Sequence, residues 1–174
     1  MRELFVLDKK NYDPNGSVGR RPSVRGIIIR DGRIAMMHSK KYDYYKLPGG
    51  GIEAGETLEE TLIREVREES GLVVKPETIK EFGYVRRIEK GKEEDIFVQD
   101  NFYFLCEAES VIVEQKLDDY EAEEQFTLEF VTVEHATNVN EFSNHFEKEK
   151  ILTFRGMIER ENRVLKLLLE EGKI

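Results

Sequence analysis

The sequence predicts a single domain of mixed α/β class over residues 1–174, with a helical segment at about 140–171. Three observations predict this class. Strand-like apolar runs lie on both sides of one amphipathic helix, the last part of the chain has helical spacing, and no repeat, low-complexity tract or linker divides the chain. A chain of 174 residues is also long enough for one hydrophobic core.

Short strands are predicted before the amphipathic helix. The run RELFVLD predicts a strand, and NYDPNG predicts a turn because Asp-Pro and Asn-Gly both favour turns. The stretch VRGIIIRDGRIAMMHS contains two apolar runs separated by Asp31 and Gly32. This pattern predicts a β-hairpin with a two-residue turn.

The amphipathic helix has clear start and stop signals. Pro48 and the three glycines after it predict a loop. Thr57 followed by Glu60 is a capping box, so the helix is expected to begin near Leu58 and to end at Gly71. Its apolar residues recur at intervals of four: Leu58, Leu62 and Val66.

Further strands are predicted after the helix. The runs IKEFGYVRRIE and DIFVQDNFYFLCEA predict two strands joined by the charged loop EKGKEE, and LEFVTVE predicts a shorter one. The segment at 140–171 is expected to be helical, with Gly156 dividing it. Its apolar stripe suits packing on the domain's own sheet, and it is also long enough to cover a homodimer partner. The stripe consists of Phe142, Phe146, Ile151, Phe154, Ile158, Leu165 and Leu168.

Composition excludes several classes of protein. The net charge of −9 disfavours binding to duplex nucleic acid, and it would also repel a polyphosphate unless metal ions neutralise the site. No apolar run approaches the roughly 20 residues that span a bilayer, and the N-terminus is too charged for a secretory signal, so no membrane association and a cytoplasmic location are expected. Cys106 is the single cysteine, which excludes an intramolecular disulfide.

Three carboxylates share one face of the amphipathic helix. Glu65, Glu68 and Glu69 stand at positions i, i+3 and i+4, and Arg64 lies beside them. Oxygen ligands without nearby histidine or thiolate favour a hard ion, Mg²⁺ or Mn²⁺. The alternative is a solvated helix face, which most charge runs are. The glycine loop, capping box, arginine and terminal glycine in register favour the metal site.

The stretch from Gly50 to Leu72, GGIEAGETLEETLIREVREESGL, resembles the signature of the Nudix hydrolases at every defining position. The resemblance implies an α/β/α sandwich with a mixed β-sheet. It also implies a metal-dependent hydrolase that cleaves the pyrophosphate bond of a nucleoside diphosphate linked to another moiety, with metal-activated water. The alternative is a nucleotide-sensing binding module on the same fold, typically after loss of acidic residues that are all present here.

The resemblance also implies residue roles. Glu68, Glu69 and the backbone carbonyl of Gly49 are expected metal ligands, and Glu65 is expected to be either a ligand or the base that deprotonates water. Arg64 is expected to orient Glu65. Glu56 is expected either to contact the metal or to form a hydrogen bond between the loop and the helix. A further metal ligand is expected at Glu124, and Glu123 is the close alternative.

Substrate contacts are expected from cationic and aromatic side chains outside the signature. Arg25, Lys46, Arg86 and the neighbouring Arg87 are the cationic candidates, and surface solvation is the alternative for each. Tyr84 and Phe102 could stack on a base, although aromatic residues on strands more often belong to the core. Substrate marks of several Nudix subfamilies are absent, so nucleoside triphosphates and nucleotide sugars both stay open as small nucleotide substrates.

Overall fold

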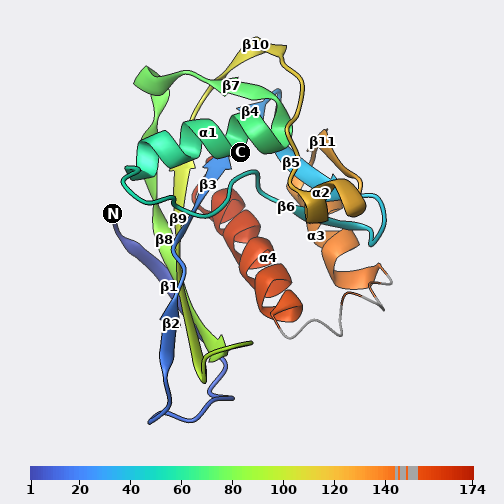
Figure 1. The fold of residues 1–174 in the computed structure, drawn as a ribbon. Coiled ribbons are helices and arrows are strands. Elements are labelled where there is room, and N and C mark those ends of the chain that lie inside the picture. The colour runs from blue at the N-terminus through green and yellow to red at the C-terminus, as the bar shows by residue number, and fades with distance from the viewer. Residues whose placement is uncertain (144, 146–147, 149–152) are drawn as a thin grey trace.

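The computed structural model describes residues 1–143, 145, 148 and 153–174, and its elements form three layers (Figure 1). Helix α1 (Leu58–Ser70) covers one face of the β-strands. Helices α3 (Val133–Phe142) and α4 (Phe154–Glu170) cover the opposite face. The predicted α/β/α sandwich with a C-terminal helical segment is therefore confirmed.

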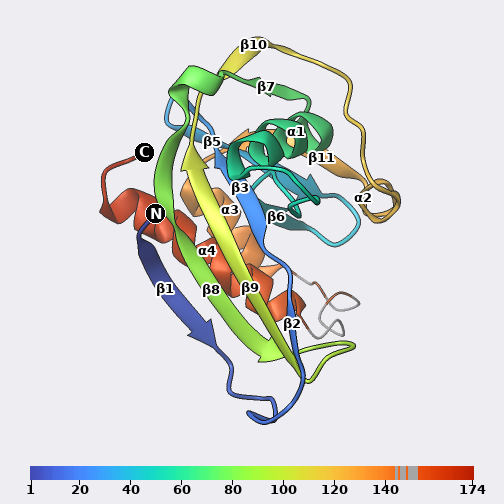
Figure 2. The ribbon, with the colours of Figure 1, turned by 60° about the vertical axis from the view of Figure 1, so that its left-hand side comes forward.

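The larger sheet is mixed and has the strand order β1-β8-β9-β2, with β3 also paired to β9. The long strands β8 and β9 form an antiparallel hairpin, whereas β1, β2 and β3 run parallel to their partners. Figure 2 shows β1, β8 and β9 side by side, with α4 behind them. The strands are β1 (Glu3–Asp8), β2 (Val18–Arg20), β3 (Ser23–Ile27), β8 (Lys80–Lys90) and β9 (Ile96–Leu105).

A second, antiparallel sheet contains the predicted hairpin. Its order is β11-β5-β4, and β6 also pairs with β5. The turn between β4 and β5 has positive φ at both Asp31 (49°) and Gly32 (69°), as a type I′ hairpin turn requires. The strands are β4 (Ile29–Arg30), β5 (Arg33–Ser39), β6 (Tyr44–Lys46) and β11 (Phe126–Val131). The remaining elements are β7 (Leu72–Val74), a 3₁₀ turn (Pro76–Thr78), β10 (Ala108–Ile112) and α2 (Asp119–Glu123).

Helix α1 begins and ends where its capping signals predict. The Thr57 hydroxyl accepts from the Glu60 amide (3.2 Å), and the Glu60 carboxylate accepts from the Thr57 amide (2.9 Å). Gly71 ends the helix in the left-handed conformation with φ 73°. A Cβ atom on Gly26 of β3 would lie 2.8 Å from the Val66 side chain, so glycine there allows α1 to pack closely on β3.

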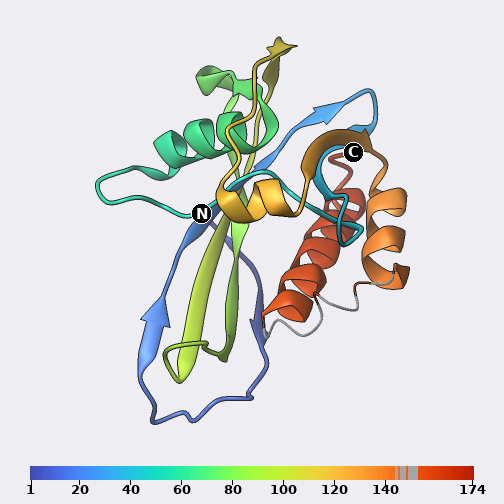
Figure 3. The same ribbon diagram turned by 45° about the vertical axis from the view of Figure 1, so that its right-hand side comes forward.

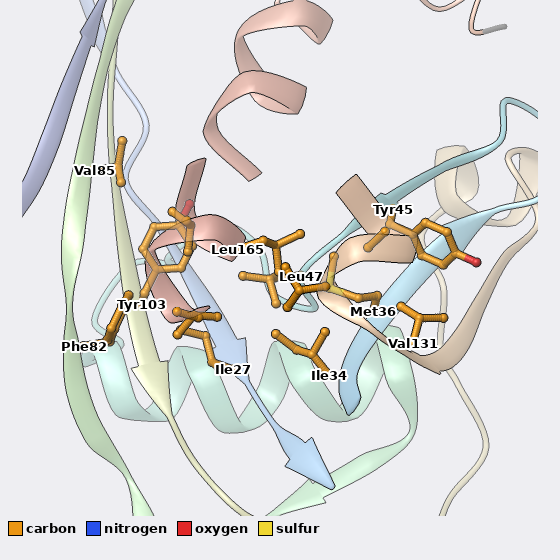
Figure 4. Packing of buried hydrophobic residues seen from close by; sticks show 14 of the residues in the cluster. Ile27, Ile34, Met36, Tyr45, Leu47, Phe82, Val85, Tyr103, Val131 and Leu165 are labelled. Atoms are coloured by element: carbon orange, nitrogen blue, oxygen red, sulfur yellow. The ribbon is translucent and has the colours of Figure 1, made fainter. Parts of the chain in front are cut away.

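The core on the other side of the strands is formed with α3 and α4. Figure 4 shows Leu165 of α4 next to Leu47, with Ile34 and Met36 nearby. All four side chains are fully buried. Burial of these apolar side chains stabilises the C-terminal helix against the sheet, because apolar area removed from water contributes about 25 cal/mol per Å².

Two expectations about the C-terminal part are wrong. The strand predicted for LEFVTVE ends at Val131, because the Thr132 hydroxyl accepts from the His135 amide and starts α3. Gly156 does not divide the helical segment but lies inside α4, where a Cβ atom would come within 2.7 Å of Glu89 on β8. The division instead falls between α3 and α4.

The predicted apolar stripe is only partly buried. Phe142 is 80% exposed, whereas Phe154, Leu165 and Leu168 are buried. Phe146 and Ile151 lie outside the described residues. Among the described residues, no helix is long and apolar enough to cross a membrane.

Candidate active site

The glycine loop between β6 and α1 is fixed to both neighbouring layers. Gly49 has φ 136°, and a Cβ atom there would lie 2.1 Å from the Val24 carbonyl oxygen, so this position requires glycine. The Gly49 amide donates to Glu69 Oε2 (3.0 Å), and its carbonyl accepts from Arg25 Nη1. The loop backbone is thereby bonded to α1 and to β3.

Arg64 is the centre of a carboxylate network on α1. Its guanidinium donates to both oxygens of Glu56, from Nε at 2.6 Å and from Nη2 at 2.8 Å. Its Nη1 donates to Glu65 (2.7 Å) and Glu68 (3.2 Å), and its Nη2 also reaches the Gly51 carbonyl (3.2 Å). Arg64 thus contacts Glu65, and it contacts Glu56 and Glu68 as well, while its orienting role toward Glu65 stays a prediction.

Glu56 serves the loop as well as Arg64. Its carboxylate accepts from the Glu53 amide (3.1 Å) and the Thr61 hydroxyl (2.9 Å). Hydrogen bonds from Arg64 are the main cause that lowers the pKa of Glu56 to about 2. The loop-to-helix hydrogen bond weighed for Glu56 is therefore present.

A second group of charges lies in the interior beside the loop. Lys46 Nζ donates to Glu69 Oε1 (2.8 Å) and to Glu121 Oε1 (2.9 Å). Glu69 is 3% exposed and Glu121 is 4% exposed. Burial raises the pKa of Glu69, and the neighbouring Glu121 adds to that rise. Burial opposes the charge of Lys46, but the two carboxylates outweigh it and raise the pKa of Lys46.

Among the acidic side chains around Arg64 and Lys46, Glu65 lies against the glycine loop and Glu68 lies nearer the surface. A Cβ atom on Gly50 would lie 2.2 Å from Glu65 Oε2, so the carboxylate rests directly against the loop backbone. Burial raises the pKa of Glu65, although Arg64 opposes the rise. The Glu68 side chain is 40% exposed and has Arg64 as its ionic partner. Glu68 is thus the more solvent-accessible of the two.

The structure places Glu121, rather than Glu124, beside Glu69. Glu124 accepts from the hydroxyls of Tyr44 (2.7 Å) and Ser39 (3.3 Å) and pairs with Lys148. Glu123 is exposed and pairs with Lys41 (2.6 Å). Glu121 is not among the ligands predicted from the sequence, because its proximity to Glu69 is a long-range contact.

A local signal for Glu121 was nevertheless present in the sequence. The Asp118 amide donates to Glu121 Oε2 (3.2 Å), which is half of a capping box at the start of α2. Asp118 followed three residues later by Glu121 is the spacing that predicts such a box. The capping spacing predicts a helix start, but it contains nothing about the distance to Glu69.

The candidate substrate residues separate into two groups. Arg25 and Arg87 line a cleft of about 590 Å³ beside the glycine loop, which we call the outer cleft. Tyr84 and Arg86 lie on the other face of β8, where Tyr84 donates to Glu3 (3.0 Å) and Arg86 pairs with Asp100 (2.7 Å). The Tyr84 ring lies 5.9 Å from that of Phe102 on the same face. The structure therefore brings Arg25, Lys46 and Arg87 to the site, and leaves Tyr84, Arg86 and Phe102 away from it.

The outer cleft is rich in backbone and cationic groups. Its walls come from the glycine loop, β2 and the β8–β9 hairpin, and Tyr120 of α2 closes one side. The lining residues used below are Arg20, Arg21, Arg25, Gly50, Arg87 and Lys92. Such a lining favours an anionic ligand despite the negative charge of the whole chain.

The donor set suits a hard divalent ion. Glu65, Glu68, Glu69 and Glu121 offer carboxylate oxygens, and Gly49 offers a carbonyl, which are the ligands that magnesium and manganese prefer. Within the described part of the chain, no three acidic, histidine or cysteine side chains are gathered closely enough to hold an ion as they stand. They are paired instead around Arg64 and Lys46, which supply positive charge at the same places.

Comparison with known proteins identifies the family. The family model described as NUDIX domain matches residues 19–153, so the chain belongs to this family. Its members generally use divalent metal ions. The MutT protein from Bacillus halodurans has a similar fold, with a TM-score of 0.54 and 20% identity over 81% of this chain and 84% of that one.

Two curated relatives match over a shorter region. An ADP-ribose pyrophosphatase from Methanocaldococcus jannaschii is 40% identical over 60 residues, which cover 33% of this chain and 36% of the relative. An RNA pyrophosphohydrolase from Halorhodospira halophila is 48% identical over 58 residues, which cover 32% of each. The matches thus span about a third of the length of these relatives.

Proposed function

We propose that the protein is a pyrophosphohydrolase that depends on Mg²⁺ or Mn²⁺ and hydrolyses a nucleoside diphosphate linked to another moiety. The observation that carries this proposal is the placement of two carboxylate pairs beside the glycine loop at a cationic cleft. Glu65 and Glu68 share Arg64, and Glu69 and Glu121 share Lys46. The names of the two relatives, an ADP-ribose pyrophosphatase and an RNA pyrophosphohydrolase, support the same class of reaction.

The residues that would hold the ion are those with oxygen donors around the loop. They are Glu65, Glu68, Glu69, Glu121 and the Gly49 carbonyl. Glu56 is bonded to Arg64, which in turn contacts Glu65. A divalent ion supplies a water of lowered pKa and neutralises charge that develops on the phosphate oxygens. Glu65 acts as a ligand or as the base, since its carboxylate lies against Gly50 at the edge of the outer cleft.

The other side chains position the reacting groups. Arg64 holds Glu56, Glu65 and Glu68 with a planar fork, which restricts their rotation before substrate arrives. The cationic lining of the outer cleft orients the phosphate chain of the substrate. A small nucleotide is therefore the proposed partner, and a cytoplasmic location stays a prediction.

Product release from a panel of compounds tests this function. The panel contains nucleoside triphosphates, ADP-ribose, nucleotide sugars and dinucleoside polyphosphates, each assayed with magnesium, with manganese and with chelator. We expect metal-dependent hydrolysis of at least one class and none with chelator. Nucleotide binding without hydrolysis across the whole panel would contradict the enzyme and support the sensing module.

A further inference from the structure

A pocket of about 200 Å³ that is open to solvent, which we call the inner chamber, lies between the larger sheet and α4, next to the outer cleft. Figure 3 shows α2 close to the loop, with the long strands of the sheet on one side and α4 on the other. Six lining residues of the chamber matter here: Arg25, Lys46, Arg87, Gln99, Tyr120 and Arg160. Four of them also line the outer cleft, so a ligand in the cleft has direct access to the chamber.

Five cationic side chains line the chamber, and three of them have ionic partners: Arg160, Lys46, and Lys148, which pairs with Glu124. Arg160 donates to Glu161 Oε1 (2.6 Å) and to Asn101 Oδ1 (2.5 Å), and it is 1% exposed. Lys46 is bound by Glu69 and Glu121, as described above. Arg160 and Lys46 therefore have structural partners that account for their burial.

Arg87 is different because its buried guanidinium lacks a complete set of partners among the described residues. Its side chain is 5% exposed, and Nη1 donates to the Thr153 carbonyl (3.3 Å). Its Nε lies 3.3 Å from Glu89 Oε1, yet neither atom makes a hydrogen bond with any residue that the structure describes. Arg25 Nε is also buried without a hydrogen-bond partner in the described part of the chain. Buried polar atoms of native proteins are nearly always bonded, so the two guanidinium groups are incompletely satisfied by these contacts. The two Nε atoms are closed off from solvent, so a ligand would meet the terminal N–H groups of Arg25 and Arg87, which line both the cleft and the chamber.

The electrostatics of Arg87 agree with this interpretation. Burial, together with the positive charge of Arg160, lowers the pKa of Arg87 to about 10. Glu89 only partly compensates, and burial raises the pKa of Glu89 itself. A purely structural Arg87–Glu89 ion pair would instead be expected to make the hydrogen bonds that these two groups leave unmade.

We infer that the inner chamber binds a terminal phosphate group of the substrate through Arg87 and Arg25. This inference rests on the proposed function and narrows its substrate class. Substrates that end in a free phosphate, such as nucleoside triphosphates, are preferred over ADP-ribose and nucleotide sugars, whose ends are uncharged sugars. Guanidinium groups suit this ligand because their planar N–H donors match phosphate oxygens.

Two measurements on the intact protein test the inference. The first is calorimetric binding of inorganic phosphate in the presence of chelator, which probes the chamber without metal or turnover. The second is kcat/KM for a nucleoside triphosphate and for ADP-ribose with metal. In the wild-type protein we expect phosphate binding and a higher kcat/KM for the triphosphate.

The test variant is Arg87→Gln, and its matched control is Arg86→Gln on the opposite face of β8. Arg87→Gln is expected to weaken phosphate binding and to lower kcat/KM for the triphosphate by about tenfold or more, since a hydrogen bond to a charged group is worth about that factor. It should lower kcat/KM for ADP-ribose by a clearly smaller factor, because Arg87 also lines the outer cleft but ADP-ribose has no terminal phosphate for the chamber. Arg86→Gln should alter none of these values. If Arg87→Gln does not fold, Arg87→Lys keeps the charge and should retain part of the phosphate binding.

The outcomes distinguish phosphate binding in the chamber from the hydrolysis reaction, and the terminal phosphate of a substrate from free inorganic phosphate. Equal phosphate binding by wild type and Arg87→Gln, or no binding by wild type, would overturn the inference while leaving the hydrolase intact. Phosphate binding without preference for the triphosphate would assign the chamber to free inorganic phosphate and overturn the substrate assignment. Absence of metal-dependent turnover for every compound would overturn the proposed function, and the chelator experiment would still decide whether the chamber binds phosphate.

Discussion

Arg64 and Glu56 form a two-point ion pair across the turn that leads into α1, with N–O distances of 2.6 and 2.8 Å. The same guanidinium contacts Glu65 and Glu68. One side chain therefore connects the loop before the helix to the carboxylates on it. The position of these carboxylates depends on the shape of the guanidinium as well as on its charge.

Arg64→Lys should lower activity although the charge is kept. Lysine presents one ammonium and cannot bind both oxygens of Glu56 while also reaching Glu65. Loss of such a supporting partner typically costs about 10–100-fold in activity or metal affinity. Steady-state kinetics and magnesium titration would measure it, with Arg67→Lys on the exposed side of α1 as the matched control. Equal activity of both variants would show that the fork is dispensable.

Glu68→Gln should keep the fold and lose most metal-dependent turnover. The Glu68 side chain is 40% exposed, and its one ionic contact within the described residues, to Arg64, is long at 3.2 Å, so its charge contributes little to stability. Thermal melts should therefore match those of the wild type, while turnover at saturating magnesium falls. Near-normal turnover would remove Glu68 from the ligand set.

Glu121→Gln should impair turnover more than Glu124→Gln. Glu121 shares the Lys46 ammonium with Glu69, whereas Glu124 is bonded to Tyr44 and Lys148 on another side of α2. We expect a loss of at least about 10–100-fold for Glu121→Gln, because it removes one proposed ligand and also a partner of the Lys46 ammonium that Glu69 shares. Glu123→Gln is the exposed control. A larger effect from Glu124→Gln would restore the assignment made from sequence.

Local signals explain which parts of the fold were predictable. The Thr57 capping box, the Gly71 terminus and the Asp31-Gly32 turn depend only on neighbouring residues, and all three were found from sequence. Glu121 was missed because its site role depends on contact with Glu69, which is far away in the chain. No local pattern contains that contact.

The choice between Arg86 and Arg87 shows a second limit. Adjacent residues on a strand face opposite sides, so the sequence predicts that one of the pair faces the site but not which one. The register of β8 also shifts between Glu81 and Gly83. As a result Phe82 and Val85 pack in the same core although they are three residues apart. A bulge of this kind reverses the alternation that a regular strand would follow.

Leu165→Ala should strongly destabilise the protein, which tests whether α4 belongs to the domain's own core. Leu165 is fully buried beside Leu47 and Met36. Truncation of such a leucine typically costs about 2–5 kcal/mol, through lost burial and the cavity left behind. Urea unfolding would measure the loss, with Leu169→Ala as the control because Leu169 is 49% exposed. Similar small effects from both would indicate that α4 is held by something other than this core.

Stability should also fall as pH is lowered, in part through Glu129. Burial opposes ionisation of Glu129, but hydrogen bonds from Lys40, Tyr45 and His38 outweigh it and lower its pKa to about 2. Because the folded-state pKa is lower than the usual value of about 4.3, the unfolded protein binds the proton more readily. The stability contributed by the ionised Glu129 is therefore fully present above a pH of about 4.3 and is lost as the pH falls toward 2.

Thermal melts between pH 2 and pH 6 test the contribution of Glu129. They should show a smaller pH dependence for Glu129→Gln than for the wild type. Glu109→Gln, at an exposed position on β10, should keep the wild-type profile. Parallel profiles for Glu129→Gln and wild type would show that another carboxylate is responsible.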